Sequence, residues 1–95
     1  MKYSEHCKRA EEKFGNPWYV VHKFLDEFAK QDLANHRRAR HHSEGVEEVR
    51  KRWGDEAAEV AIQHIKDDMI DYGGIVPDVE WYNKFWVENK NEKQK

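Results

Sequence analysis

The chain has 95 residues, which suffices for one compact domain and is too short for a two-domain enzyme. Hydrophobic and charged residues each make up 38% of it, and the formal net charge of −2 gives no overall positive field for nucleic acid or an anionic membrane. Cys7 has no second cysteine to pair with, and no apolar run approaches the roughly 20 residues of a membrane span. We therefore expect a cytoplasmic protein with neither a membrane nor a long nucleic acid as partner.

Glycine and proline divide the first half of the chain into short predicted helices. Residues 3–14 form the first, which ends at Gly15, a residue suited to the left-handed position after a helix. Asn16 and Pro17 then supply an N-cap and a first-turn proline. The second helix carries apolar residues with helical period: Val20, Val21, Phe24, Leu25 and Phe28. The stretch 31–42 either continues this helix after a bend or forms a third one.

The second half predicts three further helices. Ser43 is positioned to cap a short helix that contains Val46, Val49 and Trp53 and ends at Gly54. Asp55 is then the expected N-cap of the longest helix, which runs to about Tyr72. Its predicted buried stripe is Ala58, Ala61, Ile62, Ile65, Met69 and Tyr72. After Gly73 and Gly74, Asp78 caps a last helix that carries Val79, Trp81, Tyr82, Phe85 and Trp86.

These elements predict an all-α fold, a compact bundle of about five to six short helices in one domain. The domain spans residues 1–88, and residues 89–95 form a flexible charged tail. Four tryptophans exceed what so small a core can easily bury. We therefore expect a homo-oligomer.

Two pairs of side chains have the spacing of helical metal ligands. His22 and Asp26 lie four residues apart in the second predicted helix, and His64 and Asp68 lie four apart in the longest one. Each pair projects from one helical face and can present an imidazole nitrogen and a carboxylate oxygen to one ion. Mixed nitrogen and oxygen donors favour a divalent zinc, manganese, iron or nickel ion over calcium.

The positions of these pairs favour a functional role. His64 lies beside Ala61 at the edge of the predicted buried stripe, and His22 lies beside Leu25. Each pair should therefore face inward or into a cleft. The alternative is chance pairing in a chain rich in acidic residues, which would make both pairs ordinary half-buried helix pairs worth roughly a few tenths of a kcal/mol.

Histidine and arginine are concentrated at residues 35–42, the strongest local positive patch in the sequence. Arginine matches the geometry of phosphate oxygens, and a neighbouring metal-bound water would be placed to attack phosphorus. His36, Arg37 and Arg40 are therefore the candidate substrate-binding residues. The alternative is a solvated basic face that pairs with the glutamates following it.

The order of these motifs resembles a known family. His22-x-x-x-Asp26, His36-Arg37, His41-His42-x-x-Gly45, Gln63-His64-x-x-x-Asp68 and an Ile-x-Pro around Pro77 are similar to small bacterial and phage proteins described as a domain of unknown function. The resemblance covers residues 14–86 and supports the choice of site residues. Its phage members imply a nucleotide-directed role, such as degrading a cyclic-nucleotide signal of bacterial antiviral defence. The His and Asp inventory is also similar to that of HD-domain phosphohydrolases, without their adjacent His-Asp doublet.

Three functions remain open at the level of sequence. The first is a metal-assisted phosphodiesterase acting on a small linear or cyclic nucleotide. Its expected metal ligands are His22, Asp26, His41, His64 and Asp68, and its expected catalytic residues are His41, His42, His64 and Asp68. The second is a non-catalytic nucleotide sponge that uses the same side chains. The third is a structural or protein-interaction module in which the last aromatic helix forms an interface.

Overall fold

The computed structural model describes residues 2–27 and 39–86, with side chains up to residue 84. Across these ranges the chain is helical and contains no strand, which confirms the predicted all-α class. The elements are α1 (Tyr3–Phe14), α2 (Tyr19–Leu25), α4 (Ser43–Trp53), α5 (Asp55–Asp68), the 3₁₀-helix η1 (Ile70–Tyr72), α6 (Val79–Trp81) and the π-helical turn η2 (Tyr82–Trp86). None of the helices in the described part is long and apolar enough to cross a membrane.

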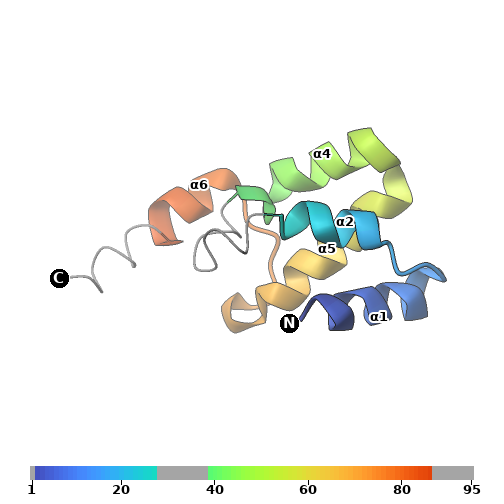
Figure 1. Cartoon of the computed structure of the whole chain (residues 1–95). Helices are drawn as coiled ribbons and strands as arrows, with labels where there is room; N and C mark the ends of the chain where they lie inside the picture. The colour runs from blue at the N-terminus through green and yellow to red at the C-terminus, as the bar shows by residue number, and fades with distance from the viewer. Residues whose placement is uncertain (1, 28–38, 87–95) are drawn as a thin grey trace.

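Helix α5 is the centre of the bundle and packs against α1, α2 and α4. In Figure 1, α4 lies above α2 and α5, and α1 lies below them. Alanines at positions 57, 58 and 61 are fully buried on α5 and let the neighbouring helices approach closely. The rest of the core comes from Ala10, Val21, Leu25, Val46, Val49, Val60, Ile65 and Met69.

The first helix has the predicted bounds, and Gly15 follows it in the left-handed conformation with φ 74°. The second helix begins later than the sequence predicts. The Asn16 side chain accepts a hydrogen bond from the Trp18 N–H at 2.8 Å, so it caps a turn and not the helix. Trp18 occupies the N-cap position, and α2 runs from Tyr19 to Leu25. The predicted core residue Phe28 lies outside the described residues.

Helices α4 and α5 meet at Gly54, which follows the end of α4 and precedes the start of α5. Its φ is 99°. Asp55 is therefore the first residue of α5 and not its N-cap. Helix α5 also ends earlier than predicted, at Asp68, and continues only as the 3₁₀ turn of η1. Because the direction of the chain changes there, Tyr72 leaves the buried stripe and is 47% exposed.

The segment after Gly73 and Gly74 returns across the bundle to α6. Asp78 caps this helix as predicted, since its Oδ1 accepts a hydrogen bond from the Trp81 N–H at 2.7 Å. Tyr82 follows at the start of η2 and is fully buried. Its hydroxyl donates a hydrogen bond to the His41 carbonyl. The tail predicted at residues 89–95 lies outside the described residues.

Candidate metal centre

His64 and Asp68 form the inner wall of the site on the last turn of α5. Both are buried, as their position beside the apolar stripe predicts. Asp68 Oδ2 lies 2.9 Å from His41 Nε2 and 3.3 Å from His64 Nε2. The other oxygen, Oδ1, lies 3.0 Å from His6 Nε2. The two oxygens of this carboxylate therefore face different histidines.

The end of α2 supplies Asp26, which is the C-cap residue of that helix. Its Oδ1 lies 3.3 Å from His64 Nε2 and 3.4 Å from His41 Nε2. The Asp26 side chain is 22% exposed, whereas the side chains of His41 and His64 are fully buried. The site is thus most accessible from the side of Asp26.

His22 lies one turn before Asp26 on α2 and is also buried. Its Nδ1 lies 2.8 Å from His64 Nδ1, on the side of the His64 ring opposite to the carboxylates. The predicted pairing of His22 and Asp26 on one helical face is present, but the two side chains contact different atoms of His64.

His41 enters the site from the bend that precedes α4. The Tyr82 hydroxyl donates a hydrogen bond to the His41 carbonyl at 2.7 Å, and the Ser43 N–H donates one to the Pro77 carbonyl at 2.9 Å. Gly45 completes this arrangement, because a Cβ there would overlap the Arg40 carbonyl oxygen and lie 2.8 Å from its carbon. The spacing of the His41-His42-x-x-Gly45 motif therefore has a steric reason.

Four side chains bring one ligating atom each to a common point. These atoms all lie within 4.8 Å of one another, and three of the four residues are buried. We call this group the His/Asp cluster; it consists of Asp26, His41, His64 and Asp68. Nitrogen and oxygen donors that converge from three separate segments can hold a metal ion.

Burial and the carboxylates act in opposite directions on the imidazoles. Burial lowers the pKa of His41 to about 4, although the hydrogen bond with Asp68 acts against this shift. Burial, together with His64 and His6, also lowers the pKa of His22 to about 4. For His64, burial is outweighed by Asp26 and Asp68, which raise its pKa. Of the two imidazoles in the His/Asp cluster, that of His41 is therefore neutral at pH 7, as metal coordination requires, whereas a metal ion would have to displace the proton that the carboxylates favour on His64.

The carboxylates are kept ionised by the same contacts. Burial alone would raise the pKa of Asp68, but hydrogen bonds from His41, His6 and His64 lower it strongly. The pKa of Asp26 is lowered as well, because the hydrogen bond and charge of His64 exceed the effect of burial. Both groups are thus available as anionic ligands.

The remaining predicted residues lie elsewhere. His42 caps α4: its Nδ1 accepts from the Gly45 N–H at 3.1 Å, and its Nε2 lies 3.1 Å from the Ala39 carbonyl. The Arg40 guanidinium donates to the Phe24 carbonyl at 2.7 Å and pairs with Glu27 at 2.5 Å. The other two predicted phosphate-binding residues, His36 and Arg37, fall outside the described residues.

Sequence reasoning missed His6 and Tyr82. His6 is 2% exposed, and its ring stacks on that of His64 with the centroids 3.6 Å apart. Its spacing to the buried Ala10 is four residues, which was the available signal for an inward-facing position. Tyr82 acts through the backbone of a residue 41 positions away, a contact that no local pattern reveals.

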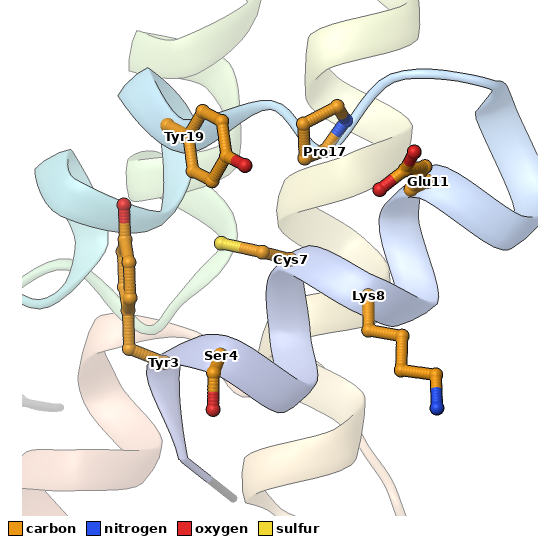
Figure 2. Close-up of a pocket in the computed structure, with 7 residues that line it drawn as sticks. All are labelled: Tyr3, Ser4, Cys7, Lys8, Glu11, Pro17 and Tyr19. Atoms are coloured by element: carbon orange, nitrogen blue, oxygen red, sulfur yellow. The ribbon is translucent and has the colours of Figure 1, made fainter.

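A small surface pocket lies beside α1 and the start of α2. Figure 2 shows Tyr3 and Tyr19 on one side of it, with the Cys7 sulfur pointing toward the space between these two rings, and Pro17 on the other side. Ser4, Lys8 and Glu11 complete its lining. Burial raises the pKa of both the Tyr3 hydroxyl and the Cys7 thiol, and the negative charge of Asp26 adds to both shifts. The charge of Asp26 therefore acts on two of the side chains that line this pocket.

Comparison with known proteins identifies the family of the chain but indicates no activity. A family described as "Domain of unknown function (DUF6915)" matches residues 1–91, which confirms the resemblance to an uncharacterised family. No curated protein and no solved structure matches the chain.

Proposed function

Because the chain belongs to the DUF6915 family, whose description names no activity, we propose its function from the site: a mononuclear metalloenzyme that hydrolyses a phosphoester. The His/Asp cluster binds a first-row divalent ion. The substrate is a small nucleotide, linear or cyclic. An ion held by these residues would lower the pKa of a bound water and would polarise a phosphoryl oxygen.

One observation carries the metal assignment, namely the spacing of the ligating atoms. The two carboxylate oxygens lie 2.9 to 3.4 Å from the Nε2 atoms of His41 and His64, and these two nitrogens lie 3.1 Å from each other. With metal–ligand bonds of about 2.0–2.1 Å, neighbouring ligands lie about 3.3–3.4 Å apart in a tetrahedron and about 2.9 Å apart in an octahedron. All four atoms lie within 4.8 Å of one another, so one ion can reach them once the two carboxylates adjust their positions.

The donor set narrows the choice of metal. Two imidazole nitrogens suit zinc, iron, nickel and manganese better than calcium or magnesium, which prefer oxygen alone. The two carboxylates balance the charge of a divalent ion. Zinc is the first candidate, because four nitrogen and oxygen ligands at these distances match its usual coordination.

Hydrolysis requires that water and substrate reach the metal, and the exposure of the His/Asp cluster allows this on one side. Asp26 is the one partly exposed member of the His/Asp cluster, with 22% of its side chain exposed, so water can approach from this side. The charge of Asp26 acts on Tyr3 and Cys7 in the lining of the pocket, where the rings of Tyr3 and Tyr19 can flank a planar base. Lys8 on its rim supplies a positive charge for a phosphate.

A second candidate function is a purely structural metal site. It is favoured by the near-complete burial of His41, His64 and Asp68 and by the origin of the whole His/Asp cluster in three segments, which a metal would tie together. In that case metal would raise the melting temperature, and no bond would be cleaved.

The test is reconstitution of chelator-treated protein with Zn²⁺, Mn²⁺, Fe²⁺ or Ni²⁺, followed by chromatography of linear and cyclic nucleotides. We expect one of these metals to restore product formation. His41→Asn should remove activity, whereas His42→Asn should keep it, because asparagine is itself a strong N-cap. Nucleotide depletion without product would indicate a sponge, and metal-dependent stability without either would indicate a structural site.

Cys7 offers a direct test of the pocket, since it is the one cysteine in the chain. A bound nucleotide between Tyr3 and Tyr19 should slow the reaction of Cys7 with a thiol reagent. Tyr19→Ala should remove this protection and raise KM while leaving metal content unchanged. Equal labelling rates with and without saturating nucleotide would show that the substrate binds elsewhere.

A further inference from the structure

Two buried histidines contact the His/Asp cluster without belonging to it. His22 lies 2.8 Å from the His64 ring, and His6 lies 3.0 Å from the Asp68 carboxylate. Each contact reaches the ligating residue at the atom that does not face the cluster. Both histidines are buried, with 1% and 2% of their surface exposed.

We propose that His22 and His6 are positioning residues that select which atoms of His64 and Asp68 face the metal. This inference rests on the proposed metal site. It reassigns His22, which the sequence pattern marked as a ligand, to the layer behind the ligands. It also gives His6 a role that no motif indicated.

The contact between His22 and His64 determines where protons lie on both rings. A neutral imidazole carries a proton on only one nitrogen, and a nitrogen that binds a metal cannot carry one. If His64 binds through Nε2, its proton is on Nδ1 and is donated to His22 Nδ1 across the 2.8 Å contact. His22 must then accept at Nδ1. Such a hydrogen bond fixes the orientation of a ligand ring and increases its basicity.

In the contact between His6 and Asp68 the roles are reversed, because the supporting histidine donates the hydrogen bond and the ligand accepts it. His6 Nε2–H donates to Asp68 Oδ1 at 3.0 Å, which leaves Oδ2 turned toward His41 and His64. The ring of His6 stacks on the ring of His64 at 3.6 Å, so it holds both ligands of α5 at once. The hydrogen bond to Oδ1 restricts rotation of the carboxylate, so Oδ2 stays directed toward the metal.

The two contacts make different demands on a replacement side chain. The oxygen of asparagine occupies the place of a histidine Nδ1, and the amide nitrogen of glutamine occupies the place of Nε2. His22→Asn therefore keeps the acceptor and His22→Gln does not. His6→Gln keeps the donor and His6→Asn does not. A role in packing alone would not produce this crossed pattern.

The experiment measures Zn²⁺ affinity by competition with a chromogenic chelator for wild type and these four variants. We expect His22→Gln and His6→Asn to weaken binding roughly 10- to 100-fold, the usual effect of losing an outer hydrogen bond. His22→Asn and His6→Gln should recover most of the affinity. The melting temperature of each metal-free variant identifies any that fails to fold.

Co²⁺ substitution separates positioning from ligation. If His22 lies behind the ligands, the visible spectrum of Co²⁺-loaded His22→Gln should match that of wild type in shape, with one ion bound per chain. A changed spectrum would make His22 a ligand and overturn the inference. Equal Zn²⁺ affinities for all four variants would also overturn it. If wild type itself binds no metal, the proposed function fails first, so the two failures are distinguishable.

Discussion

At the level of single residues, Gly45 shows how one side chain, or its absence, determines the position of a candidate ligand. It lies inside α4, where alanine normally stabilises a helix by up to about 1 kcal/mol relative to glycine. Here the carbonyl of Arg40 occupies the place of a Cβ. The backbone contact therefore reverses the usual preference and holds the bend that carries His41.

We predict that Gly45→Ala lowers the melting temperature and weakens metal binding together, because the bend must move away from α4. Glu44→Ala, at an exposed position in the same turn, is the matched control and should change neither. Thermal denaturation with and without Zn²⁺ measures both effects. A more stable Gly45→Ala protein would show that the close approach to Arg40 does not exist.

Tyr82 acts on the same bend through one hydrogen bond. Tyr82→Phe removes the donor to the His41 carbonyl and leaves the ring in the core. We expect a loss of about 1 to 2 kcal/mol in the free energy of unfolding, measured by urea denaturation. Tyr19→Phe, at a 57% exposed position, should have little effect on stability. Equal losses for the two variants would argue against a specific contact with His41.

At the scale of elements, the sequence predicts what depends on neighbours in the chain. The bounds of α1, the cap at Asp78 and the four-residue spacing of His64 and Asp68 are local features, and the structure confirms them. The start of α2 and the end of α5 differ from the predicted bounds. The Asn16 side chain caps the turn before α2 and not the helix itself, and the chain bends after Asp68.

Local sequence patterns do not predict the contacts between helices. The pairing of His6 with Asp68 spans 62 positions, and that of His22 with His64 spans 42. Neither follows from helix periodicity, which gives the face of a residue and not the partner helix. The sequence therefore predicted that His22, Asp26, His64 and Asp68 face inward, but not how they divide between ligands and supporting residues.

At the scale of the whole molecule, the buried imidazoles couple stability to pH in the metal-free state. His22 and His41 have a folded-state pKa of about 4 and an ordinary value of 6.5. Between these values the unfolded chain binds their protons and the folded chain does not, so stability falls as pH falls. The raised pKa of His64 has the opposite sign, but its contribution is already complete below pH 6.5.

We therefore predict that chelator-treated protein loses stability from pH 6.5 toward pH 4, with a slope of up to about 1.4 kcal/mol per pH unit for each of the two imidazoles. Urea denaturation at several pH values measures this slope. His22→Asn should reduce it, because asparagine does not titrate. A metal-free protein that is equally stable at both ends of this range would contradict the neutral, buried state of these rings.

Elemental mass spectrometry of the reconstituted protein measures whether Asp68 and its partners bind one metal ion. The neighbouring Asp67 provides a matched control, because its carboxylate pairs with Arg9 at 2.6 Å and does not belong to the His/Asp cluster. After loading with Zn²⁺ and gel filtration, wild type and Asp67→Asn should each retain one ion per chain, and Asp68→Asn should retain none. Wild type without metal, or Asp68→Asn with as much metal as Asp67→Asn, would contradict the account.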